Sequence, residues 1–321
     1  MNVIWLPSAL ALAMTTAAVE PLKEQAAGGA IGPNLGDQQT EVLDLDTDAN
    51  QRLTIPVTID GSGPYNFMID TGSQATAVTH GINDQLDLAP LGTATLIGMA
   101  STRSVDLVEL EELGFGSRIV YNLTAPVLQR EHVGADGIIG LDTLQDMRVL
   151  IDFRNETIAV ADGADKPSNR GFEIIVRARQ KLGQLLITNA KIEGVRATVI
   201  IDTGAQTSLG NTALLRRIKA RRAEELTATD VNGVVLRGDW AIVEEMTVQG
   251  LSMRNMPIAF ADTPAFDALG LRDTPVLSLG MQHLKIFDRV AIDFSNQRVL
   301  FDLPSKYRLR KSIRRARASR L

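Results

Sequence analysis

The chain has 321 residues, of which 45% are apolar and 4% aromatic, and it contains no cysteine. This length suits two domains, and their cores must be mainly aliphatic. The missing cysteines exclude disulfides, thiolate metal sites and a cysteine nucleophile. The formal net charge is -5 at pH 7, and an acidic body argues against a nucleic-acid partner.

The N-terminal segment predicts export. Residues 1–19 carry no charged side chain and end in small residues, with Thr16, Ala17 and Ala18 placed as a cleavage site. This pattern is typical of a signal peptide, which indicates a periplasmic or secreted protein. The alternative is an uncleaved segment, because ~20 apolar residues span a bilayer and would anchor the protein to a membrane. Residues 20–45 are weakly periodic and predict a linker or pro-segment.

An internal repeat organises the rest of the chain. Residues 66–74 (NFMIDTGSQ) match residues 198–206 (TVIIDTGAQ), which places Asp70 and Asp202 at equivalent positions. Two further matches follow in the same order, Ile138–Leu144 with Ser278–Leu284 and Ile151–Phe153 with Ile292–Phe294. Three collinear matches indicate a duplication. It predicts an N-terminal lobe over residues 46–163 and a C-terminal lobe over residues 170–304.

The pattern within each lobe is that of strands. Residues 53–59 alternate apolar and polar side chains and then reach a turn at Asp60-Gly61, and residues 185–192 do the same before Glu193-Gly194. Short strands with turns between them predict an all-β sandwich or barrel in each lobe.

Two segments depart from this strand pattern. Asn211 is placed as an N-cap, and Leu214, Leu215 and Ile218 share one helical face, so the pattern predicts a helix over residues 212–226. Residues 305–321 hold 8 of the 33 basic residues and no acidic residue, which predicts a solvated basic tail.

The repeated Asp-Thr-Gly turns carry the predicted chemistry. Duplicated lobes tend to pack about a pseudo-twofold axis, which would bring Asp70 and Asp202 together across the lobes. Two carboxylates in contact cannot both ionise at low cost, so the pair holds one proton. Such a pair can activate a water, with one member as general base and the other as general acid. No cofactor and no metal is then needed, and the three histidines (His80, His132 and His283) lack metal-ligand spacing.

The chain resembles the retroviral-type (retropepsin-like) aspartic proteases. The resemblance lies in two Asp-Thr-Gly motifs after apolar pairs, each followed later by a second motif, Ile138-Ile139-Gly140 or Ser278-Leu279-Gly280. It implies two β-barrel lobes fused on one chain, with a cleft between them and a polypeptide as substrate. Retroviral enzymes are homodimers, whereas this chain carries both halves and is therefore expected to be a monomer.

The resemblance also implies site roles. Asp70 and Asp202 would be the catalytic pair, supported by neighbours in the two loops: Thr71, Gly72, Ser73, Thr203, Gly204 and Ala205. Ile139 and Leu279 would back these loops. A flap over the substrate would lie near four residues of lobe one: Ile97, Gly98, Met99 and Ala100. Its partner would lie near Asp230–Gly233.

Two positions break the repeat. Ser73 follows the first Asp-Thr-Gly motif where Ala205 follows the second. A hydroxyl at Ser73 could hold Asp70 in the ionised state, so we expect Asp70 to be the general base. Ser278 stands where the motif favours an apolar residue.

Two alternatives remain open from the sequence. The same bilobal fold could bind extended peptides without cleaving them, since sheet edges grip peptides by backbone pairing. The lobes could also pair between two chains rather than within one, because the linker over residues 163–169 allows either arrangement.

Overall fold

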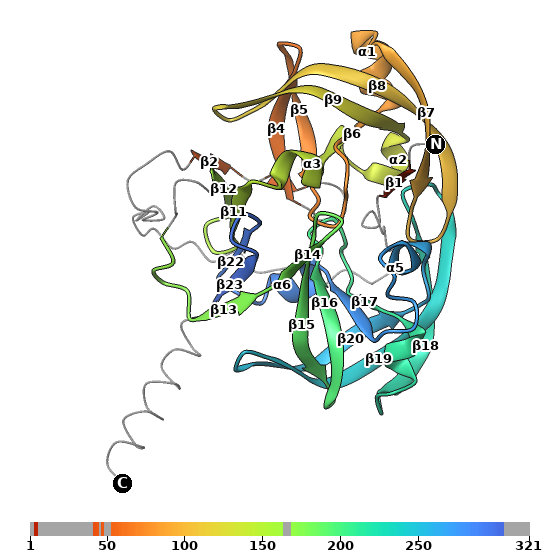
Figure 1. The fold of residues 1–321 in the computed structure, drawn as a ribbon, viewed down its shortest axis with the longest axis vertical. Coiled ribbons are helices and arrows are strands. Elements are labelled where there is room, and N and C mark those ends of the chain that lie inside the picture. The colour runs from red at the N-terminus through yellow and green to blue at the C-terminus, as the bar shows by residue number, and fades with distance from the viewer. Residues whose placement is uncertain (1–2, 6–40, 45, 48–52, 163–167, 305–321) are drawn as a thin grey trace, which may run out of the picture.

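The computed structural model describes residues 3–5, 41–44, 46–47, 53–162 and 168–304, which form three β-sheets (Figure 1). The predicted signal peptide and linker lie outside the described residues, apart from two short strands, β1 (Val3–Trp5) and β2 (Glu41–Asp44). The predicted tail over residues 305–321 lies wholly outside them. Among the described residues, no helix has both the length and the apolar character to cross a bilayer.

Lobe one is a nine-stranded sheet in the order β1-β7-β8-β9-β6-β10-β5-β4-β3. An additional antiparallel pairing between β4 and β8 curls the sheet on itself. Its strands after β1 are β3 (Asp46–Thr47), β4 (Leu53–Ile59), β5 (Ser62–Ile69), β6 (Ala77–Thr79), β7 (Pro90–Ile97), β8 (Thr102–Phe115), β9 (Arg118–Leu128) and β10 (Gly137–Ile139).

Lobe two is an eight-stranded sheet in the order β14-β15-β16-β21-β17-β20-β19-β18, with an additional pairing between β15 and β19. Its strands are β14 (Arg179–Lys181), β15 (Gln184–Ile192), β16 (Val195–Ile201), β17 (Leu209–Gly210), β18 (Arg221–Thr229), β19 (Val235–Val248), β20 (Leu251–Phe260) and β21 (Val276–Leu279). The strand order from β15 to β18 repeats that from β4 to β7 in lobe one. The prediction of two all-β lobes is confirmed.

Within the part of the chain that the structure describes, six short helices connect the strands. They are α1 (His80–Leu86), α2 (Arg130–Val133), α3 (Leu141–Leu144), α4 (Thr212–Leu215), α5 (Pro264–Ala268) and α6 (Met281–Leu284). The prediction of a helix over residues 212–226 is wrong beyond its first turn. Asn211 is the N-cap, its side chain accepting from the Leu214 amide at 2.9 Å. From Arg221 onward, however, pairing with β19 places the chain in β18, so tertiary contacts override the local helical pattern.

A third sheet joins the two lobes in the order β13-β23-β22-β11-β12-β2. Its other strands are β11 (Met147–Asp152), β12 (Thr157–Asp162), β13 (Ile174–Arg177), β22 (Arg289–Asp293) and β23 (Arg298–Asp302). At its centre β11 of lobe one pairs antiparallel with β22 of lobe two, Arg148 opposite Asp293 and Asp152 opposite Arg289. Residues 289 and 293 of lobe two correspond to residues 148 and 152 of lobe one in the internal repeat, with an offset of 141 positions. The two pairs are therefore equivalent, and a pseudo-twofold axis lies between the two strands.

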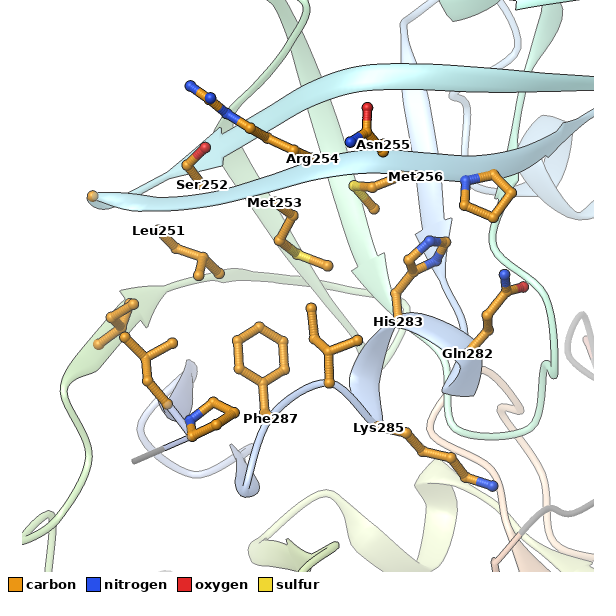
Figure 2. A pocket seen from close by; sticks show the side chains of 16 residues that line it. Leu251, Ser252, Met253, Arg254, Asn255, Met256, Gln282, His283, Lys285 and Phe287 are labelled. Carbon is orange, nitrogen blue, oxygen red and sulfur yellow. The ribbon is translucent and has the colours of Figure 1, made fainter. Parts of the chain in front are cut away.

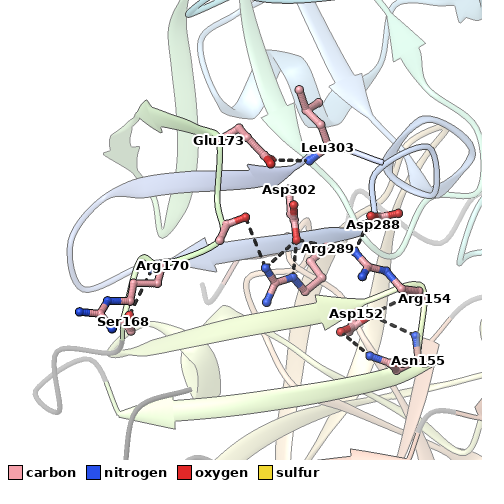
Figure 3. A network of polar contacts seen from close by, with 11 residues as sticks. Asp152, Arg154, Asn155, Ser168, Arg170, Glu173, Asp288, Arg289, Asp302 and Leu303 are labelled. Carbon is pink, nitrogen blue, oxygen red and sulfur yellow. Dashed lines mark hydrogen bonds and ion pairs between the residues drawn. The ribbon is translucent and has the colours of Figure 1, made fainter. Parts of the chain in front are cut away.

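Ion pairs between charged side chains stabilise this central sheet (Figure 3). Arg154 of lobe one forms an ion pair with Asp288 of lobe two. Arg289 donates from Nε to Oδ2 of the buried Asp302 at 2.6 Å. The largest cluster of buried apolar side chains includes residues of both lobes and of the central sheet. The central sheet and the shared core therefore hold the two lobes in a fixed relative orientation. This orientation determines how the two active-site loops contact each other.

Candidate active site between the lobes

Both Asp-Thr-Gly motifs leave a buried strand at the face between the lobes. Strand β5 leads into Asp70 and runs parallel to β10, and β16 leads into Asp202 and runs parallel to β21. The Asp70 amide donates to the Ile139 carbonyl O at 3.0 Å, and the Asp202 amide donates to the Leu279 carbonyl O at 3.1 Å. Ile139 and Leu279 thus back the loops, as the resemblance implies. Both aspartates are almost fully buried, with exposures of 0% and 2%.

The threonines of the two motifs bond across the lobe boundary. The Thr71 amide donates to Thr203 Oγ1 at 3.0 Å, and the Thr203 amide donates to Thr71 Oγ1 at 3.2 Å. Each hydroxyl in turn donates to the opposite strand end, Thr71 Oγ1 to the Ile201 carbonyl O at 2.9 Å and Thr203 Oγ1 to the Ile69 carbonyl O at 2.7 Å. This reciprocal set joins the two loops within a single chain.

The loops approach each other closely at the carboxylates. A Cβ added to Gly204 of lobe two would lie 2.3 Å from Asp70 Cγ, so only glycine fits beside the Asp70 carboxylate. Oδ1 of Asp70 accepts the Gly72 amide at 2.8 Å and the Ser73 amide at 3.0 Å. Oδ1 of Asp202 accepts the Ala205 amide at 3.0 Å. Buried carboxylates with backbone donors are positioned rigidly, and here one lies against the loop that carries the other.

The expected role of the Ser73 hydroxyl is wrong. Ser73 Oγ donates to the Ala75 carbonyl O at 2.7 Å, and its single proton is therefore not available to Asp70. A hydroxyl does reach the other carboxylate, because Ser278 Oγ donates to Asp202 Oδ2 at 2.8 Å. The sequence marked Ser278 as a departure from the motif, but its contact with Asp202 follows from the parallel pairing of β16 with β21.

The predicted flap is the β7–β8 hairpin, closed by the Gly98 amide donating to the Ser101 carbonyl O at 2.8 Å. Its partner in lobe two is the β18–β19 hairpin, whose turn holds Asp230. Each flap tip packs an apolar side chain against the opposite lobe. Met99 of lobe one packs in a cluster of lobe-two residues, whereas Val231 of lobe two packs in a cluster of lobe-one residues. Ile97 and Ala100 pack at the edge of the Met99 cluster.

Asp230 joins the two flap tips. Its Oδ2 accepts the Ala100 amide at 3.0 Å and the Ser101 hydroxyl at 2.8 Å. The carboxylate fits over the first flap because Gly98 has no side chain, and a Cβ there would lie 2.7 Å from Asp230 Oδ2. The flaps are therefore closed over the aspartates in this structure.

A small cavity of about 10 Å³ lies beside Asp202, beneath the closed flap. It is lined by Gly72, Met99, Gln184, Ile200, Asp202, Phe266 and Ser278. Gln184 lies outside the repeated motifs, and sequence reasoning did not select it. It is the first residue of β15, directly after the turn of the β14–β15 hairpin. Its side chain extends to lobe one, where Nε2 donates to the Gly72 carbonyl O.

A larger groove of about 840 Å³ lies on lobe two, between the start of β20 and α6 (Figure 2). Its lining includes Met253, Met256 and Phe287 but no residue of either Asp-Thr-Gly loop. His283 lines the groove and bonds through Nδ1 to Ser208 Oγ at 2.7 Å. Burial lowers the pKa of His283 to about 4. Among the described residues, no three His, Asp or Glu side chains cluster as a metal site.

Fold and site together define a bilobal β-protein whose two acidic turns meet at a pseudo-twofold axis. The aspartyl protease family matches the chain twice, over residues 55–143 and 188–282, which together cover more than half of it. The chain therefore belongs to the aspartyl protease family, with one copy of the family's lobe in each match. No individual protein of curated function shows a significant sequence match to the chain.

Proposed function

We propose that the protein is an aspartic endopeptidase, which hydrolyses peptide bonds with a water activated between Asp70 and Asp202. The observation that carries the proposal is the reciprocal Thr71–Thr203 bonding, which fixes the two acidic turns against each other. The close approach of Gly204 to the Asp70 carboxylate supports the same arrangement. Membership of a protease family implies a polypeptide substrate.

The chemistry needs one proton shared by two carboxylates. The ionised aspartate takes a proton from water as the water oxygen bonds to the peptide carbonyl carbon. The protonated aspartate gives its proton to the carbonyl oxygen, which yields a neutral tetrahedral diol. As the diol collapses, the C–N bond breaks, the protonated aspartate gives its proton to the amide nitrogen, and the ionised aspartate takes a proton from one diol hydroxyl. The products are an amine and a carboxylic acid, and the pair again holds one proton. The burial of Asp70 and Asp202 supports this role, because electrostatic interactions are stronger away from bulk water.

The decisive test compares three variants on a peptide library. Asp70→Asn and Asp202→Asn should each abolish cleavage, whereas Asp84→Asn, an exposed aspartate on α1, should cleave at the wild-type rate. A statine-type inhibitor, which mimics the tetrahedral intermediate, should bind the wild type tightly. If wild-type protein binds extended peptides but cuts none between pH 3 and 8, the protein is an idle peptide binder and the proposal fails.

We also propose that the enzyme works as a monomer. The bonds between Thr71 and Thr203 lie within one chain, so the pair of loops is complete without a second copy. Analytical ultracentrifugation of active enzyme should give a single species near 34.8 kDa, or slightly less after removal of an N-terminal segment. Activity found only in a dimer peak would contradict this proposal.

The place of action is proposed from the sequence alone. We propose that residues 1–19 direct export to the periplasm or outside the cell, with membrane anchoring if they are retained. N-terminal sequencing of the protein recovered from the extracellular or periplasmic fraction should begin after Ala18 or close to it. An intact Met1 in a cytosolic fraction would overturn the proposal.

A further inference from the structure

The two sides of the active site differ in polarity. On the lobe-one side, the flap residue Val231 packs among apolar side chains that include Met68, Val133 and Ile138. On the lobe-two side, the cavity beside Asp202 has an apolar wall of Met99, Ile200 and Phe266 and a polar wall of Gln184 and Ser278. An enzyme built from two equal halves would present two equal subsites, and this one does not.

Gln184 is the polar residue of this cavity that no internal contact fully satisfies. Its side chain is completely buried, with an exposure of 0%. Nε2 donates to the Gly72 carbonyl O, and Oε1 has no hydrogen-bond partner among the described residues. A buried acceptor without a donor destabilises the structure, so a substrate group that supplies the donor would bind favourably.

The orientation of the Gln184 amide follows from its anchor. A carbonyl oxygen only accepts hydrogen bonds, so the side that faces Gly72 must be the NH₂ group. Oε1 is therefore the free end of the amide. Gln184 and Gly72 both line the cavity that also contains Asp202. Gln184 thus stands in the wall of a cavity next to Asp202.

We infer that Gln184 is a specificity-determining residue, which selects substrates that place a short side chain with a hydrogen-bond donor beside Asp202. This inference rests on the proposed function. The selected residues are serine, threonine and asparagine, at one of the two positions that flank the scissile bond. The other flanking position, on the Val231 side, takes an apolar side chain.

The size of the cavity gives the same preference. At about 10 Å³ under the closed flap, it holds a group no larger than one water molecule. A long side chain would have to displace Met99, whereas a hydroxyl or a short amide reaches Oε1 with less movement of the flap. Ser278 cannot supply the missing donor, because its hydroxyl proton is directed at Asp202 Oδ2.

The test is a cleavage profile of a peptide library by wild-type enzyme and by Gln184→Met, which keeps the side-chain length but removes the acceptor. We expect the wild type to enrich serine, threonine and asparagine at one flanking position. Gln184→Met should reduce that preference about 10-fold relative to peptides with alanine or valine there. Gln180→Met is the matched control, because Gln180 is exposed on the same hairpin, and its profile should equal that of the wild type.

The ratio between peptides separates specificity from a structural role. If Gln184 only braces Gly72, Gln184→Met lowers kcat/KM equally for all peptides, and the inference is overturned. Apolar preference at both flanking positions in the wild type also overturns it, while leaving the enzyme a protease. Failure of the wild type to cut any peptide that Asp70→Asn leaves intact would instead count against the proposed function itself.

Discussion

The two lobes share a strand order but differ in the side chains around their acidic turns. In lobe one the Gly140 amide donates to Thr76 Oγ1, which itself donates to Asp142 Oδ1 at 2.7 Å and bonds to the Thr143 hydroxyl at 2.8 Å. In lobe two the Gly280 amide donates to Ser208 Oγ, and the partner of that hydroxyl is the ring of His283.

Two further substitutions separate the halves. Ser278 of lobe two contacts Asp202 where lobe one has Ile138, and Asp230 of the second flap faces Gly98 of the first. A homodimer must keep its two halves identical, whereas a fused chain is free to vary them. Duplication has thus conserved the backbone frame while the side chains on it have become unequal.

The largest expected effect on activity is that of a substitution at Gly204, where the active-site loops of the two lobes are in contact. Gly204→Ala would place a methyl group 2.3 Å from Asp70 Cγ and force the carboxylate to move. Because a displacement of ~1 Å can cost ~10²-fold in rate, we expect kcat/KM to fall by ~100-fold or more. Gly81→Ala in α1 is the control, since a Cβ there has no atom within 4 Å. A Gly204→Ala variant with wild-type activity would show that the loops do not meet in this way.

The His283 contact should make lobe two sensitive to acid. Burial lowers the pKa of His283 from 6.5 to about 4, so between these values the unfolded chain binds a proton that the folded chain excludes. The contribution of His283 to stability is therefore complete above pH 6.5 and is lost as the pH falls toward 4. The loss reaches about 3 kcal/mol. The double variant Ser208→Thr/His283→Thr, which copies the Thr76–Thr143 pair of lobe one, should lose less stability than the wild type between pH 7 and pH 4.

Urea unfolding at the two pH values measures this difference. Thr143→Ser keeps the hydroxyl that bonds to Thr76 and to Asp142 in lobe one, so its loss of stability between the two pH values should equal that of the wild type. Equal acid sensitivity of the wild type and the double variant would contradict the assigned role of His283.

Ser278 should set the acidic limb of the pH–rate profile. Its hydroxyl donates to Asp202 Oδ2, and a donor stabilises the ionised form of a carboxylate. Ser278→Ala should therefore move the acidic limb of the kcat/KM profile to higher pH. Ser73→Ala should leave the limb in place, because that hydroxyl donates to the Ala75 carbonyl O. The opposite ranking of these two variants would restore the expectation drawn from the sequence.

The smallest effect is expected at the flap contact. Ser101→Ala removes one of the donors to Asp230 Oδ2 but leaves the Ala100 amide in place. Closure should weaken by ~1 kcal/mol, so the Ala100 amide should exchange hydrogen ~5-fold faster. Ser104→Ala, at an exposed position of β8, is the matched control and should exchange as the wild type does. Unchanged exchange at Ala100 in Ser101→Ala would show that Asp230 does not hold the flaps together.

Local patterns and the internal repeat in the sequence determine much of this protein. The alternation over residues 53–59 with a turn at Asp60-Gly61 predicted the β4–β5 hairpin, because strand period and turn residues act over a few neighbours. The repeated Asp-Thr-Gly motif predicted which aspartates to pair, since a duplicated sequence folds into duplicated lobes. The Asn211 cap was also correct, because capping depends only on adjacent residues.

Only the tertiary structure decided the contacts that make the two halves unequal. Residues 221–226 form a strand rather than a helix because β19 supplies their hydrogen bonds. The Ser278 hydroxyl reaches Asp202, and the Gln184 amide reaches Gly72, over 76 and 112 residues of chain. Such contacts depend on how whole strands pack and not on the residues beside them in sequence. The sequence therefore determined the two repeated lobes and their acidic turns. Packing across the pseudo-twofold axis decided which side-chain contacts differ between the two lobes.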